Sequence, residues 1–152
     1  MASGFIILED GRCFAPQWRC YDFVLREVIT VLVNDLNEQE LANWLTCLLP
    51  GSSDEEEIGI GAWVRKSDGE IISRHFDVRE LTKDNQHLFN QAARLALLRV
   101  QKASAGKLED SMGCLSHLVD MIERAEKGEP PLSMSDWTCV QPPSGQKAGP
   151  GW

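Results

Sequence analysis

Lysine and arginine are absent between Glu27 and Val64, although this stretch contains eight acidic residues. Residues 1–60 hold eleven acids and three bases, whereas residues 61–152 hold twelve of each. The net charge of −8 therefore comes entirely from the first two-fifths of the chain. Such a balance argues against nonspecific binding to nucleic acid or to an anionic membrane, and it favours a basic protein partner.

Further absences narrow the class of protein. No basic segment precedes the short apolar run Phe5–Leu8, and no apolar run could cross a bilayer, so we expect neither a signal peptide nor a membrane span. The five cysteines are odd in number and show no Cys-x-x-Cys spacing, which favours a reduced, cytoplasmic compartment where most thiols pack as small hydrophobes. Because no histidine or cysteine pair has ligand spacing, we expect no metal and no other cofactor.

The apolar content is that of an ordinary globular domain. The 152 residues are 43% hydrophobic and include five Trp and five Phe, enough for a core without covalent staples. We predict a single α+β domain over residues 1–128. A Pro- and Gly-rich tail over residues 129–152 follows, packed on the domain or trailing from it, with Trp137 and Trp152 as candidate anchors.

The order of the expected elements sets the fold class. The periodicity of apolar residues and the turn signals predict hairpins at 5–15 and 58–78, and helices at 18–36, 38–48, 84–103 and 108–127. Asn37 and Thr82 are the expected N-caps, Pro16 ends the first hairpin, and Gly128 ends the last helix. The order ββααββαα predicts an α+β fold in which antiparallel β-hairpins pack against about four helices.

The second hairpin carries the most specific strand pattern. A three-residue loop at Ser67–Gly69, with Gly69 in a left-handed conformation, would place Val64 opposite Ile72 and gather nearly all apolar residues on one face. Trp63 would then lie on the polar face. The preceding stretch, Ser52 to Glu57, is expected to be a polar loop.

Three polar residues of this hairpin, Ser73, His75 and Asp77, invite comparison with a catalytic triad. Alternate strand residues lie about 6.6 Å apart, too far for the linked hydrogen bonds of a triad, and no nucleophile elbow accompanies them. The segment Gly59–Gly61 resembles a phosphate loop but lacks a third glycine and a following helix. We therefore interpret these residues as part of a polar sheet face, and we expect a protein that is not an enzyme.

The acids suggest a partner-binding surface instead. An acidic field speeds encounter with a basic partner, and tryptophan is enriched at interface hot spots, although an acidic loop can also be simply solvated. The candidate contacts, which could converge on one edge of the sheet, are Glu38, Glu40, Asp54, Glu55, Glu56, Glu57 and Trp63.

A family resemblance enters at the strand-to-helix passage Phe76–Thr82, followed by Asn85, Phe89 and Ala93. In this passage, and in its size, acidity and α+β content, the chain resembles small acidic bacterial immunity proteins of polymorphic, contact-dependent and type VI toxin systems. The passage covers about a tenth of the chain, and no binding residue is carried over from the family. The resemblance implies an antitoxin that occludes the active site of a cognate basic toxin domain. We expect such a protein to be cytoplasmic and a monomer or homodimer.

Two alternative functions are also compatible with the sequence. A secretion or effector chaperone resembles this chain in size, acidity and α+β content, and such chaperones are usually dimers that wrap an unfolded segment of their cargo. A small hydrolase would instead use Ser73, His75 and Asp77. The immunity-type binding protein is the preferred hypothesis, because the charge is segregated and the sequence carries no convincing catalytic motif.

Overall fold

The computed structural model describes residues 5–14, 20–49, 54–59, 62–73, 75–103 and 110–130. Within these ranges the chain forms four α-helices, a short 3₁₀ helix and two small three-stranded sheets, which confirms the predicted α+β class. The elements are β1 (Phe5–Ile7), β2 (Cys13–Phe14), α1 (Cys20–Asn34), α2 (Gln39–Thr46), β3 (Glu55–Gly59), β4 (Ala62–Arg65), β5 (Ile71–Ser73), β6 (His75–Asp77), η1 (Val78–Glu80), α3 (Lys83–Ala103) and α4 (Asp110–Lys127).

The first sheet has the strand order β2-β1-β6. β1 pairs antiparallel with β2, as the Asp10-Gly11 turn predicts, and parallel with β6, which lies about 70 residues further along the chain. The sheet is therefore mixed, not purely antiparallel as expected. A parallel partner has to be delivered by a long crossover, and local turn signals do not reveal it.

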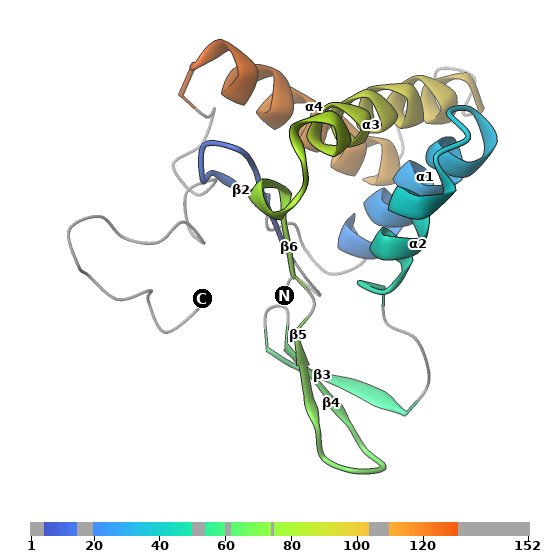
Figure 1. The fold of residues 1–152 in the computed structure, drawn as a ribbon, viewed down its shortest axis with the longest axis vertical. Helices are drawn as coiled ribbons and strands as arrows, with labels where there is room; N and C mark the ends of the chain where they lie inside the picture. Colours follow the sequence, from blue (N-terminus) through green and yellow to red (C-terminus); the bar gives the residue numbers. More distant parts are fainter. Residues whose placement is uncertain are drawn as a thin grey trace.

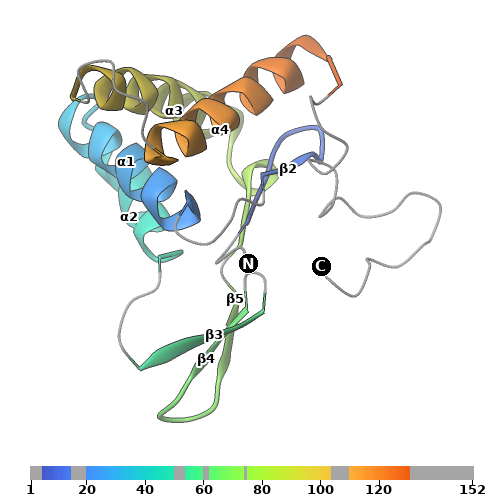
Figure 2. The ribbon, with the colours of Figure 1, turned by 180° about the vertical axis from the view of Figure 1, so that it is seen from behind.

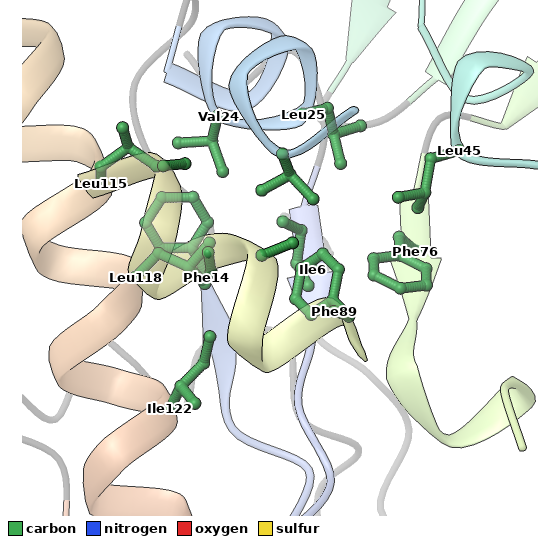
Figure 3. Packing of buried hydrophobic residues seen from close by; sticks show 14 of the residues in the cluster. Ile6, Phe14, Val24, Leu25, Leu45, Phe76, Phe89, Leu115, Leu118 and Ile122 are labelled. Atoms are coloured by element: carbon green, nitrogen blue, oxygen red, sulfur yellow. The ribbon is translucent and has the colours of Figure 1, made fainter. Parts of the chain in front are cut away.

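Side chains at matching positions of the three strands of this sheet form one side of the core. Ile6 lies opposite Phe14 on one side and Phe76 on the other, and all three are fully buried. Figure 3 shows these residues facing Val24 and Leu25 of α1, Phe89 of α3, and Leu115, Leu118 and Ile122 of α4. The ring of Phe76 meets Phe89 edge-on with centroids 4.9 Å apart. The core therefore lies between this sheet and the helices.

Helix α1 is the centre of the helical layer, since it packs against α2, α3 and α4, while α3 also packs on α4 (Figure 1). Two predicted helix-end signals are confirmed: the Thr82 hydroxyl accepts a hydrogen bond from the Asn85 N–H, and Gly128 ends α4 with a φ of 69°. The predicted Asn37 cap is wrong. Asn37 adopts a φ of 53° and Glu38 takes the N-cap position, because asparagine tolerates the left-handed turn between two helices.

A buried arginine fastens the first hairpin to the end of α4. Arg12 is 2% exposed, and its guanidinium donates to the Asp10 carboxylate at 2.6–3.1 Å. Its Nη2 also donates to the carbonyl of Glu129 at 2.6 Å, although the two residues are 117 positions apart. The start of the predicted tail is thus held to the domain. Residues 131–152, with Trp137 and Trp152, lie outside the described residues, as does Pro16.

The cysteines depart from expectation. Cys13 and Cys114 each take part in a disulfide bond, whereas Cys47 is exposed and its thiol donates to the Asn43 carbonyl at 3.5 Å. Pairing depends on which cysteines the fold brings close together, so sequence spacing alone does not predict it. The expectation that most thiols are free small hydrophobes is therefore wrong for Cys13 and Cys114. Among the described residues, no helix has the length and apolar content needed to cross a membrane.

Candidate partner-binding surface

The second sheet, with the strand order β3-β4-β5, projects from the helical layer. Figures 1 and 2 show it at the far end of the molecule's long axis from α3 and α4. Within the described parts of the chain, the extensive contacts of β3, β4 and β5 are with one another. No described residue of this sheet belongs to the core cluster, and the side chains of Glu56, Ile58 and Ile71 are exposed.

The register of this sheet differs from the predicted hairpin. Val64 pairs with Ile71, not Ile72, and the backbone N–H of Arg65 donates to the carbonyl of Glu70, so the loop has four residues. Gly69 does adopt the predicted left-handed conformation, with a φ of 72°. The preceding strand is also divided in two, because β3 pairs antiparallel with β4 across residues 60–61.

The shifted register distributes apolar residues over both faces. Trp63 is half-buried and lies beside Ile72 on one face, whereas Val64 and Ile71 share the other. Ile71 is 60% exposed, and Ile58, in the irregular part of β3, is 54% exposed. The single apolar face predicted for this hairpin is therefore wrong. Two large exposed aliphatic side chains on a projecting sheet are a feature that the sequence analysis missed.

The acidic run lies on this sheet as a strand, not as the predicted loop. Glu55, Glu56 and Glu57 form the first three residues of β3, and Asp54 continues the ladder by accepting from the Lys66 N–H at 2.8 Å. Glutamate has a low strand propensity, but pairing with β4 outweighs it here, with Glu55 directly opposite Arg65. Arg65 also forms ion pairs with Asp68 and Glu70 across the β4–β5 turn.

Glu38 and Glu40 do not join this acidic strand. Glu38 is the N-cap residue of α2 and Glu40 lies in its first turn, where a negative charge stabilises the helix dipole. Figures 1 and 2 place the start of α2 in the helical layer, separated along the long axis from β3. The seven sequence-predicted contacts therefore fall into two groups. The group on the sheet consists of Asp54, Glu55, Glu56, Glu57 and Trp63.

Trp44 of α2 lies partly at the surface. It is 40% exposed, and its ring meets Phe76 edge-on with centroids 5.4 Å apart. One side of the indole therefore contributes to the core while the other faces solvent.

The residues considered for a triad have structural roles where they are described. His75 stacks on Phe5 at 5.2 Å between ring centroids. Asp77 accepts from the Arg79 guanidinium and from its backbone N–H at 2.8–2.9 Å, and it caps η1. Ser73 belongs to the other sheet, and its side chain lies outside the described set. This arrangement gives no support to the hydrolase alternative. Among the described residues, no group of three or more histidine, cysteine or acidic side chains could hold a metal ion.

The two arginine-bound aspartates predict a loss of stability in acid. Burial opposes ionisation of Asp10, but hydrogen bonds from the Arg12 side chain and backbone, together with its charge, lower the pKa of Asp10 below its ordinary 3.8. Burial likewise opposes ionisation of Asp77, and Arg79 in the same way lowers the pKa of that carboxyl below 3.8. A carboxylate with a lowered pKa stabilises the fold above its unfolded-state pKa and stops doing so as the pH falls through its folded-state pKa.

We therefore expect the free energy of unfolding to decline as the pH falls below about 4, measured by urea unfolding at a series of pH values. Replacing both aspartates by asparagine should lower stability at neutral pH and flatten the decline in acid. Identical slopes for the wild type and the double variant would contradict these two ion pairs as its source.

A shallow groove of about 510 Å³ lies elsewhere, between the end of α1 and α3. It is lined by Asn34, Asp35, Leu95, Leu98, Arg99 and Lys102. Because this lining contains both acidic and basic groups, it favours no single ligand charge. The projecting sheet is the more specific candidate surface.

No protein-family model, no curated protein and no solved structure matches this chain, so the site is interpreted from its geometry.

Proposed function

We propose that this chain is a non-catalytic binding protein that recognises a basic protein through the sheet β3-β4-β5. The observation that carries the proposal is the position of the acidic run: Glu55, Glu56 and Glu57 lie in a strand at the edge of a projecting sheet. Residues 54–73 hold six acids and two bases, and Arg65 is already paired with Asp68 and Glu70. The exposed side chains of Ile58 and Ile71 add apolar contact area beside this charge.

In its specific form, the proposal is an immunity-type inhibitor that occludes the active site of a basic toxin domain. The resemblance of the Phe76–Thr82 passage supports this form, and an acidic projecting sheet suits the insertion of negative charge into a basic cleft. The cytoplasmic location that accompanies it stays a prediction. The disulfides of Cys13 and Cys114 weigh against that location, because structural disulfides form and persist mainly in oxidising compartments.

Charge reversal tests the surface. The product of the reading frame next to the gene is co-expressed and purified, and its association is followed by stopped-flow fluorescence at low and high salt. Replacing Glu56 and Glu57 by lysine should slow association at least tenfold at low salt, because the acidic strand steers a basic partner. The difference should shrink at high salt.

A matched control is available in the helical layer. Replacing Glu38 and Glu40 by lysine changes the net charge by the same amount at a remote place, so the association rate should fall much less. In the immunity-type form, cells expressing the toxin should grow with the wild type and with this control, and fail with the sheet variant. Equal effects of the two variants on association would remove the sheet as the contact surface.

A further inference from the structure

The outer edge of β3 can be read from the hydrogen-bond pattern of the sheet. The Lys66 N–H donates to the Asp54 carbonyl, and the Arg65 N–H points the other way, to the Glu70 carbonyl of the β5 side. In an antiparallel ladder these bonds alternate, so Glu56 bonds to Val64 of β4, and the backbone N–H of Glu57 points outward. Because β3 ends the strand order, this N–H lies on the edge of the sheet.

No described strand pairs with this edge. A sheet edge is a template for another strand, and the charge of this edge selects which one. A second copy of the chain is disfavoured, because antiparallel β3–β3 pairing would set glutamates directly opposite glutamates. A strand that carries lysine or arginine would instead place opposite charges side by side. Side chains of successive residues alternate between the faces, so the exposed Glu56 side chain meets the added strand on one face of the sheet.

We propose that the basic partner binds by strand addition: an extended, lysine- or arginine-rich segment pairs with the outer edge of β3. A backbone hydrogen bond from the Glu57 N–H supplies part of the affinity, and the negative charge of the strand supplies selectivity for positive charge. The exposed Ile58 adds an apolar contact at the end of the strand. This inference rests on the proposed function, since it specifies how the acidic sheet holds its partner.

The test uses the full chain and a synthetic peptide, acetyl-Lys-Val-Lys-Val-Lys-Val-amide, which is basic and favours an extended conformation. Binding is measured by calorimetry and by amide chemical shifts at low salt. The peptide should bind, with shifts concentrated on β3, whereas the corresponding Glu-Val peptide should not. A peptide of the same sequence with N-methylated backbone amides should bind at least tenfold more weakly, because it keeps the charge but loses its donors.

Two substitutions of Glu57 distinguish the contribution of its backbone N–H to binding from that of its side-chain charge. Glu57→Gln removes one negative charge and should weaken binding about twofold to threefold. Glu57→Pro removes the charge and the outward N–H, which β4 does not use, so an edge strand should tolerate it. Binding to Glu57→Pro should be at least tenfold weaker than to Glu57→Gln. Circular dichroism and thermal unfolding show whether each variant keeps the fold.

The outcomes distinguish this inference from the function on which it rests. Equal binding of the plain and N-methylated peptides overturns strand addition, even if Glu57→Pro does not fold. Strand addition is also wrong if the Glu-Val peptide binds as well as the Lys-Val peptide. If the reversed pair Glu56→Lys and Glu57→Lys slows association with the partner while the N-methylated peptide binds normally, the acidic surface stands and only strand addition fails. If that pair has no effect on association, the proposed function itself fails.

Discussion

Replacing Phe76 by alanine is expected to lower the free energy of unfolding by about 3–5 kcal/mol, the usual cost of emptying a buried phenylalanine site. Phe76 is fully buried, lies in register with Ile6, and meets both Trp44 and Phe89 edge-on. The cavity would open where β6, α2 and α3 meet (Figure 3). Small domains are stable by only about 5–15 kcal/mol, so this single change would remove a large part of the total.

Two controls bracket this expectation, each measured by urea unfolding at neutral pH. Phe76→Leu keeps most of the volume and should cost less than about 1.5 kcal/mol. Leu98→Ala, at a position that is 52% exposed on α3, should change stability by no more than about 0.5 kcal/mol. If Phe76→Ala costs no more than Leu98→Ala, the site can collapse around the missing ring and Phe76 does not hold the layers together.

Replacing Arg12 by methionine is expected to lower the free energy of unfolding by about 3 kcal/mol, the second large effect. The substitution leaves the Asp10 carboxylate without its guanidinium and frees the carbonyl of Glu129. The expected loss is at the lower end of the range for buried ion pairs, because Asp10 is 31% exposed and water can reach it. The loss should shrink at a pH below the pKa of Asp10, where the carboxyl becomes neutral.

Hydrogen exchange locates the effect of this substitution. The Glu129 N–H donates to the Arg124 carbonyl, so releasing Glu129 from Arg12 should speed amide exchange at the end of α4 more than in α1. Arg12→Lys keeps the charge but cannot form the two-pronged contact with Asp10, and it should lie between the wild type and Arg12→Met. Unchanged exchange at Glu129 in Arg12→Met would show that other contacts hold this segment.

The helices could be predicted because their signals are local. The apolar stripe of α3, the Thr82 cap and the Gly128 end are all encoded within a few residues of where they act. The β1–β2 hairpin is equally local. The pairing of β1 with β6 could not be predicted in the same way, because it joins Phe5 to His75 and depends on how the intervening part of the chain, including α1 and α2, folds.

The sequence indicated that the candidate surface is acidic, but it did not indicate how its residues are arranged in space. The acidic run is evident from the sequence, but a row of glutamates reads as a loop until the opposing strand with Arg65 is known. Glu38 and Glu40 were joined to it because they are near in sequence, although α2 carries them into another layer. Ile71 is exposed in a register that one extra loop residue changes, and Ile58 lies in β3, which the predicted hairpin did not separate from β4; no local pattern fixed either feature.

The strands β5 and β6 belong to different sheets, yet a single residue separates Ser73 from His75. The projecting sheet is therefore joined along the chain to the central sheet through a connection of one residue. Force applied to β4 or β5 passes directly to β6, whose ladder with β1 carries Ile6 and Phe76. A partner bound to the projecting sheet should thus change how often the β1–β6 ladder opens. A mechanical load applied to this sheet should detach β6 from β1 before it separates the helices.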